Sequence, residues 1–175
     1  MPSGIAGLRF EDEAEAINRS AQALQAQGVN ALVVTLHEGG EIGTAQQPGD
    51  WNDERCPGLR GRIVDLAARI TPAVDLIISG HTHRAYNCRI DGRLVTSADK
   101  FGTVVSEIDL LLDPATGDVL ESRAHNVIVR SERFAKDEAQ TRLIELYERL
   151  AAPLARRVVG RLAAVVPEVR AADAG

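Results

Sequence analysis

The sequence has few aromatic residues and no long apolar run, and each shortage excludes a class of protein. Phe, Trp and Tyr make up 3% of the 175 residues, and 20 Lys and Arg are outnumbered by 25 Asp and Glu, which gives a formal net charge of −5. Proteins that follow a nucleic-acid backbone need basic patches and stacking side chains, so we expect no nucleic-acid partner. Every apolar run is broken by a charge or a glycine before the roughly 18 residues that cross a bilayer, so we also expect no membrane span.

Cysteine is almost as scarce. Cys56 and Cys88 are the only two cysteines, too few for a disulfide framework or a four-cysteine zinc site. Two alternatives stay open: one bridge, if the protein functions outside the cytosol, or two reduced buried thiols. Residues 1–10 are not basic at their start and no apolar segment follows them, so no signal peptide is predicted.

The rest of the composition is that of an ordinary globular protein. Hydrophobic residues make up 45% and charged residues 26% of the chain, which excludes a disordered or collagen-like protein. A chain of 175 residues has room for one domain of the usual size, roughly 100–150 residues, together with a protruding element.

The first half of the chain alternates helical and strand patterns. Apolar residues at three- and four-residue spacing predict helices over 11–27 and 62–70. Short apolar runs rich in β-branched residues predict strands over 30–36 and 75–79, each buried on both faces. The segment 38–61 is rich in Gly, Pro, Asp and Asn and reads as a long loop, and loops of that length in a compact domain are usually functional.

The second half predicts antiparallel strands and then a helix. Residues 86–97 have the pattern of a hairpin with a type I′ turn at Asp91-Gly92, and 103–129 that of a longer hairpin. Helical spacing returns over 137–159, with a kink or break at Pro153. The fold class is therefore α/β (α+β), with mixed sheets, C-terminal antiparallel hairpins and a C-terminal helix.

Three of the four histidines follow predicted strands. His37 comes directly after 30–36, and His81 and His83 come after 75–79. In an open α/β sheet, ligands bind in the crevice beyond the carboxyl ends of the strands. A single histidine there is more often a hydrogen-bonded loop residue, but three converging imidazoles favour a metal site. His125, inside a predicted strand, is expected to be an ordinary surface or cross-strand residue.

Other catalytic motifs are not present. His37-Glu38-Gly39-Gly40-Glu41 begins like a zincin motif but has Glu where the second His is required. The glycines that follow His37 match neither a P-loop nor a dinucleotide fingerprint, and no Gly-x-Ser-x-Gly elbow occurs. Cys56 has no activating partner nearby in the sequence, so we expect no thiol nucleophile.

Two segments resemble the metallophosphoesterases of the 5′-nucleotidase type. Residues 28–40 are similar to the family segment in which a strand delivers a metal-binding His, and 75–83 contain its Gly-His-Thr/Ser-His signature as Gly80-His81-Thr82-His83. Residues 95–110 are similar to the strand pair that follows. The similarity runs from about Gly4 to Val129.

The resemblance implies a fold, a cofactor and a reaction. The family fold is an αββα sandwich of two mixed sheets flanked by helices, and a pair of divalent metal ions, zinc or manganese, activates water to attack a phosphomonoester. Carried over by position, His37 and His81 ligate one metal ion and His83 the other. The implied substrate is a nucleotide, the process is nucleotide catabolism, and the implied location is the cell envelope or the extracellular space.

Parts of the family pattern are not found in this sequence. The Asp-x-His segment, the bridging Asp and the Gly-Asn-His-Glu/Asp segment with the catalytic His lie upstream of the matching region, so no catalytic residue is assigned. We expect residues 1–133 to be the C-terminal half of a calcineurin-like metallophosphoesterase domain, inactive alone, and 134–175 a helical segment leading toward a second domain. The alternatives are a non-catalytic metal-binding or interaction module, or a half-domain that needs an N-terminal partner or self-associates.

Overall fold

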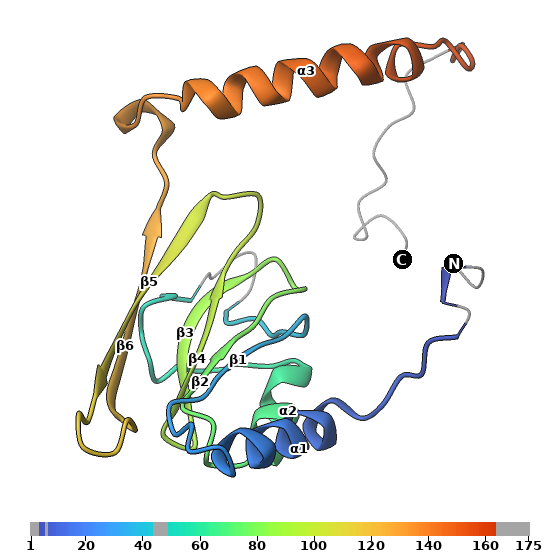
Figure 1. The fold of residues 1–175 in the computed structure, drawn as a ribbon. Helices are drawn as coiled ribbons and strands as arrows, with labels where there is room; N and C mark the ends of the chain where they lie inside the picture. Colours follow the sequence, from blue (N-terminus) through green and yellow to red (C-terminus); the bar gives the residue numbers. More distant parts are fainter. Residues whose placement is uncertain (1–3, 6, 44–48, 164–175) are drawn as a thin grey trace, which may run out of the picture. The chain divides into compact units, whose positions relative to one another are not determined.

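The computed structural model describes residues 4–5, 7–43 and 49–163, and Figure 1 shows its elements. The chain divides into two compact units, Met1–Arg130 and Ser131–Gly175. The elements of the first unit are α1 (Glu13–Gln25), β1 (Val33–Thr35), α2 (Arg62–Arg69), β2 (Leu76–Ile78), β3 (Ala85–Ile90), β4 (Arg93–Ala98), β5 (Val104–Leu112) and β6 (Val119–Ile128). The second unit contains the 3-10 turn η2 (Ser131–Arg133) and α3 (Glu138–Ala155). The predicted mixed α/β class with a C-terminal helix is confirmed.

The first sheet places the ends of three strands at one edge. Its order is β1-β2-β4-β3, in which β1 and β2 run parallel, as do β2 and β4, and β3 is antiparallel to β4. The carboxyl ends of β1, β2 and β4 therefore meet at the same edge of the sheet. β1 and β3 are the two outer strands.

Both predicted hairpins are present. Asp91 and Gly92 have φ values of 50° and 81°, as a type I′ turn requires, and they join β3 to β4. β5 and β6 form a separate two-stranded antiparallel sheet, in which the Gly117 N–H donates to the Asp113 carbonyl at 2.7 Å to close the turn. Figure 1 shows this ribbon beside β3 and β4, so two sheets are present as in a sandwich.

The core lies between the first sheet and the helices α1 and α2, which are side by side in Figure 1. Asp12 accepts a hydrogen bond from the Glu15 N–H at 3.1 Å and caps α1. The Arg93 guanidinium, from the first residue of β4, donates to the carbonyls at the end of α2 and in the turn after it, those of Ala67, Ile70, Thr71 and Val74, at 2.7–3.1 Å. Partial burial lowers the pKa of Arg93. This one side chain joins α2 to the sheet and satisfies carbonyls that a helix end leaves unpaired.

The expectation that the first strand is buried on both faces is wrong. β1 has three residues, and Val33 is 44% exposed while Thr35 is also exposed. Val33 and Thr35 share one face of β1, and their exposure shows that no helix or second sheet among the described residues fully covers that face. The sequence pattern reports apolar side chains and does not specify what covers them.

The helix of the second unit ends earlier than predicted. Asp137 caps α3 by accepting from the Gln140 N–H at 2.6 Å, and the helix ends at Ala155 rather than at Val159. Pro153 lies in its last turn, where a residue without an N–H removes a helical hydrogen bond. No helix in the described part of the chain is long and apolar enough to cross a membrane.

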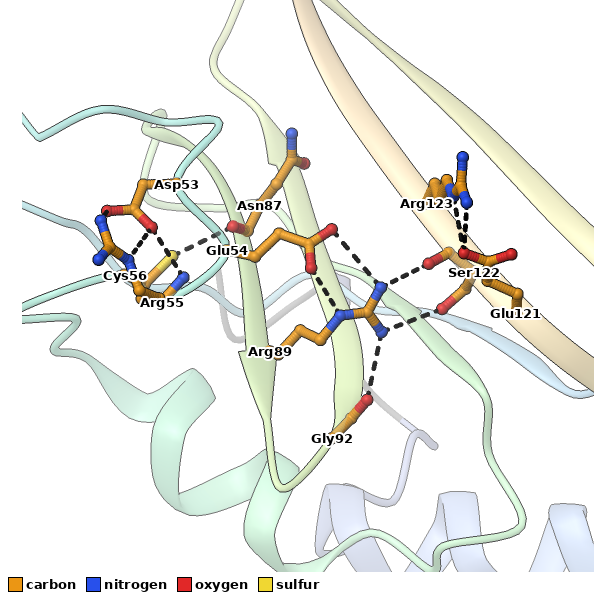
Figure 2. A network of polar contacts seen from close by, with 10 residues as sticks. All are labelled: Asp53, Glu54, Arg55, Cys56, Asn87, Arg89, Gly92, Glu121, Ser122 and Arg123. Atoms are coloured by element: carbon orange, nitrogen blue, oxygen red, sulfur yellow. Dashed lines mark hydrogen bonds and ion pairs between the residues drawn. The ribbon is translucent and has the colours of Figure 1, made fainter.

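The segment 50–59, which we call the clamp loop, is fixed by a disulfide. Cys56 and Cys88 are bonded, with their Cα atoms 5.4 Å apart, so the bridge alternative holds. Next to it, the Arg89 N–H donates to the Glu54 carbonyl at 2.8 Å and Arg89 Nε to Glu54 Oε2 at 2.6 Å (Figure 2). The clamp loop thereby covers the outer strand β3.

The clamp loop also contacts the second sheet. The Asn52 amide behaves like a strand neighbour toward Asn126 of β6: its Oδ1 accepts from the Asn126 N–H at 2.7 Å and its Nδ2 donates to the Asn126 carbonyl at 3.1 Å. The Arg89 guanidinium donates to Ser122 of β6 as well (Figure 2). The clamp loop is thus hydrogen-bonded to β3 of the first sheet and to β6 of the second.

Reduction of the disulfide should lower the free energy of unfolding by roughly 3–4 kcal/mol, because the bridge closes a chain segment of 32 residues. Urea unfolding with and without a reductant measures this difference. A double variant, Cys56→Ala with Cys88→Ala, is the control and should not respond to the reductant. Equal stability of the oxidised and reduced wild type would contradict the role of the bridge.

Candidate functional site

Two of the predicted site histidines are neighbours. His37 lies two residues beyond β1 and His81 three residues beyond β2, and their ring centroids are 4.9 Å apart with the ring planes at 79°. Both side chains are exposed. Because β1 and β2 are parallel partners, the sheet itself brings the two imidazoles together.

The third predicted ligand contacts a different neighbour. The ring of His83 lies against Phe101, with centroids 5.5 Å apart. Phe101 follows β4 and is 85% exposed, and Lys100 Nζ lies 5.9 Å from the centre of its ring. The loops that follow the carboxyl ends of β1, β2 and β4 therefore each carry a ring that lies in this region. We call this region the histidine edge, and it consists of His37, His81, His83 and Phe101.

His125 has the position expected of an ordinary strand residue. It lies in β6 opposite Glu107 of β5, and its side chain is exposed. This histidine belongs to the second sheet and follows no strand of the first.

The loops that carry His37 and His81 are fastened to each other through their backbones. The Gly80 N–H donates to the Glu38 carbonyl at 3.1 Å, and Thr82 Oγ1 donates to the Gly40 carbonyl at 2.6 Å. A Cβ on Gly39 would lie 2.1 Å from the Gly80 carbonyl oxygen, so only glycine permits this approach. The sequence reasoning tested these glycines only as part of known motifs and missed this role, although a Gly-Gly pair shortly after a strand is its signal.

A buried tyrosine is hydrogen-bonded to the same loops. Tyr86 of β3 is fully buried, and its hydroxyl accepts from the Gly40 N–H at 3.2 Å and lies 2.5 Å from Ser79 Oγ. Ser79 Oγ also lies 2.8 Å from the Thr96 carbonyl, to which it donates. Burial raises the pKa of Tyr86, so its hydroxyl stays neutral. Sequence reasoning missed Tyr86 because nothing in the pattern separates it from other strand residues.

The backbone of the histidine edge is held in an uncommon conformation. His81, His83 and Phe101 have φ values of 68°, 55° and 54°, in the left-handed region that non-glycine residues seldom occupy. Such residues persist only where their surroundings fix them, and they concentrate at functional sites. The hydrogen bonds of Gly80 and Thr82 provide that constraint here.

The histidine edge contains side chains of a type that binds metal ions. Two adjacent, exposed imidazoles are suitable ligands for zinc or manganese and fill two positions of a coordination sphere. Within residues 4–5, 7–43 and 49–163, no group of three or more His, Cys, Asp or Glu side chains is placed to hold an ion. The donor set fits a metal ion only in part, and we derive no catalytic step through one.

Comparison with curated proteins gives three relatives. The chain is 30% identical over 163 residues to the endonuclease YhcR of Bacillus subtilis, 31% over 120 residues to the cell wall protein Lmo0130 of Listeria monocytogenes, and 25% over 156 residues to the trifunctional nucleotide phosphoesterase protein YfkN of B. subtilis. These matches cover 93%, 67% and 77% of this chain, but only 12%, 15% and 10% of the relatives. No family model matches the chain.

Comparison with solved structures identifies the fold. The calcineurin-like phosphoesterase YfkN from B. subtilis superposes with a TM-score of 0.64 at 22% identity, over 85% of this chain and 46% of that one. The 5′-nucleotidase precursor from Thermus thermophilus gives a TM-score of 0.59 at 21% identity, over 86% of this chain and 29% of that one. The similarity lies in the C-terminal part of the phosphoesterase fold.

Proposed function

Because this chain has the fold of the C-terminal part of the calcineurin-like phosphoesterases and is homologous to YfkN, we propose that it contributes half of a metal-dependent phosphomonoesterase site of the 5′-nucleotidase type. In this proposal residues 1–133 are the half-domain and 134–175 lead toward a further domain. The substrate is a nucleotide or a similar phosphorylated small molecule.

The observation that carries the proposal is the imidazole pair of His37 and His81. The rings are 4.9 Å apart, both are exposed, and the Gly39–Gly80 approach fixes the loops that bear them. An ordinary pair of loop histidines needs no such close backbone packing. His37 and His81 would ligate one ion and His83 a second, with zinc or manganese supplying Lewis acidity when bound.

The open edge of β1 supports an N-terminal partner for this half. β1 pairs with β2 on one side only within the described residues, and it carries no charge, Pro or Lys of the kind that protects exposed strand edges. We infer that a strand from the N-terminal half of such a domain, from the same or another polypeptide, pairs with β1.

A groove beside this edge has the character of an interior surface. It has a volume of about 300 Å³ and lies between α1 and β1. Its lining has no charged side chain: Ala16, Ile17, Ser20, Ala21, Leu24, Leu32, Val33, Val34, Thr35 and Val74. An uncharged surface formed by a strand and a helix is typical of a surface that another protein segment covers. Where that segment is not present, such a surface favours self-association.

We propose the cell envelope or the extracellular space as the location. The Cys56–Cys88 bridge supports an oxidising compartment, where such bonds persist. A cell wall protein among the relatives is in keeping with this location.

The test of the proposed site is a metal titration. We expect the protein to bind zinc or manganese weakly, because few ligands are supplied, and more weakly as the pH falls, because an imidazole must be neutral to coordinate. His81→Ala should reduce the affinity at least about tenfold, since it leaves one imidazole of the close pair. Calorimetry at several pH values measures this change.

His125→Ala is the matched control, because it removes an exposed imidazole from the other sheet and should leave the titration unchanged. Identical metal titration curves for the wild type and His81→Ala would contradict the assignment of the metal site.

A further inference from the structure

The second sheet has one edge that side chains cover and one that is open. On β6, the Asn52 amide bonds to both backbone groups of Asn126, and Arg89 donates to the Ser122 carbonyl (Figure 2). Backbone groups of β6 that point away from β5 are therefore bonded at two positions. The opposite edge of this sheet belongs to β5, and the proposed function gives it no role.

The pairing register shows which backbone groups lie at the open edge of β5. Because both backbone groups of Asn126 point away from β5, Asn126 and its partner Ser106 form a non-hydrogen-bonded pair. Such pairs recur at every second residue, so Ile108 and Leu110 are placed in the same way. The N–H and C=O groups of these three β5 residues therefore point away from β6. Within the described part of the chain, β5 has no strand partner on that side.

The open edge is long, and the backbone of β5 does nothing to block it. The strand has nine residues and no proline, and its one register shift lies at its end, between Leu111 and Leu112. Edges that proteins keep free of partners are usually short, bulged or interrupted by proline. Charged side chains are another way to protect an edge, and β5 has two of them.

These two carboxylates decide which strand can pair with β5. Glu107 and Asp109 lie on the exposed face of β5, opposite His125 and Arg123 of β6. Arg123 pairs with Glu121, at 2.7 Å, rather than with Asp109. Both carboxylates of β5 are therefore left to interact with the side chains of an incoming strand.

A second copy of β5 is a poor partner for this edge. Antiparallel pairing of β5 with itself about Ile108 places Glu107 of each copy opposite Asp109 of the other. Pairing about Glu107 or about Asp109 places that carboxylate opposite its own copy. Like charges directly opposite each other destabilise a sheet, whereas opposite charges stabilise it. The charge of β5 thus disfavours self-pairing and favours a strand that carries basic residues.

We propose that the open edge of β5 binds an extended segment of a partner polypeptide that carries basic residues at alternate positions. Backbone hydrogen bonds to the open edge supply the affinity, and side chains at alternate positions supply the specificity. Two basic residues lie opposite Glu107 and Asp109, and apolar residues lie opposite Val105 and Leu111, which are 54% and 57% exposed. This interaction does not depend on the metal ligands and goes beyond the proposed function.

The test uses two labelled peptides that differ only in charge, Val-Thr-Lys-Val-Lys-Thr-Val and Val-Thr-Glu-Val-Glu-Thr-Val, and measures their binding by fluorescence anisotropy. The lysine peptide should bind saturably and at least about tenfold more tightly than the glutamate peptide, because it places opposite charges against β5. Glu107→Lys combined with Asp109→Lys should reverse this preference. Glu15→Lys combined with Asp65→Lys is the matched control, because it changes the net charge equally through exposed carboxylates of α1 and α2, and it should keep the preference.

Hydrogen exchange measured by NMR locates the bound peptide. The amide protons of Ser106, Ile108 and Leu110 should exchange rapidly in the free protein and slowly with the lysine peptide bound, whereas that of Glu107, which faces β6, should not change. Equal affinity for the two peptides, a preference that the charge reversal in β5 leaves unchanged, or no protection of the three amides would overturn the proposal. Protection of these amides by a higher protein concentration alone would identify a second copy as the occupant and would also overturn it.

Discussion

The isolated chain should release phosphate from a nucleoside monophosphate at no more than the background rate, even with manganese or zinc added. The described residues supply no third ligand next to His37 and His81, and the sequence offers no general acid in the expected context. Loss of general acid–base catalysis alone costs about 10²–10⁴-fold, and an incomplete metal clamp adds to that. Addition of a separately expressed N-terminal half of a 5′-nucleotidase-type domain should raise the rate by several orders of magnitude, as measured by phosphate release.

The same assay distinguishes the alternatives. Metal-dependent turnover by the chain alone would mean that residues we have not identified complete the site, and its loss in His37→Ala would show that they act together with His37. Binding of the N-terminal half without turnover would favour a non-catalytic interaction module. A variant that blocks the edge, Val33→Pro, should prevent the gain in rate. Leu32 and Leu36 hydrogen-bond toward β2, so the N–H of Val33 faces the open edge, and proline removes that donor.

Gly39→Ala should lower the free energy of unfolding by about 3 kcal/mol or more, at the upper end of the cost of overpacking. The added Cβ would meet the Gly80 carbonyl oxygen at 2.1 Å and Thr82 Oγ1 at 2.9 Å, so the loops of His37 and His81 must separate. Urea unfolding measures the stability, and the metal titration of the same variant measures whether the imidazole pair survives.

Gly80→Ala provides a matched control one step away. A Cβ on Gly80 meets no heavy atom within 4 Å, so this substitution should change the stability by less than about 1 kcal/mol. If the two variants were equally stable, the close approach of the two loops would not exist in solution.

Much of the first sheet was predictable because it depends on local signals. The Asp91-Gly92 pair specifies a type I′ turn whatever surrounds it, and the apolar runs that end at His37 and His81 become parallel neighbours. The contact of these two histidines follows from that pairing. It required only that the strands be adjacent.

The features that were not predicted depend on distant parts of the chain. The exposure of Val33 is decided by whether another layer of the fold covers that face of β1, and the Cys56–Cys88 bond by how the clamp loop crosses β3. Tyr86 acquires its role from Gly40, which lies 46 residues earlier. Periodicity and turn chemistry contain no information about such contacts.

The clamp loop has a consequence for how the molecule comes apart on heating. Because it is bonded to β3 through Cys88 and to β6 through the Asn52 amide, neither sheet can open while the loop stays in place. The amide protons of β3 and β6 should then exchange with solvent at the same free energy of opening, as one cooperative unit. In Asn52→Ala, the protons of β6 should exchange first, which would divide a single unfolding step into two.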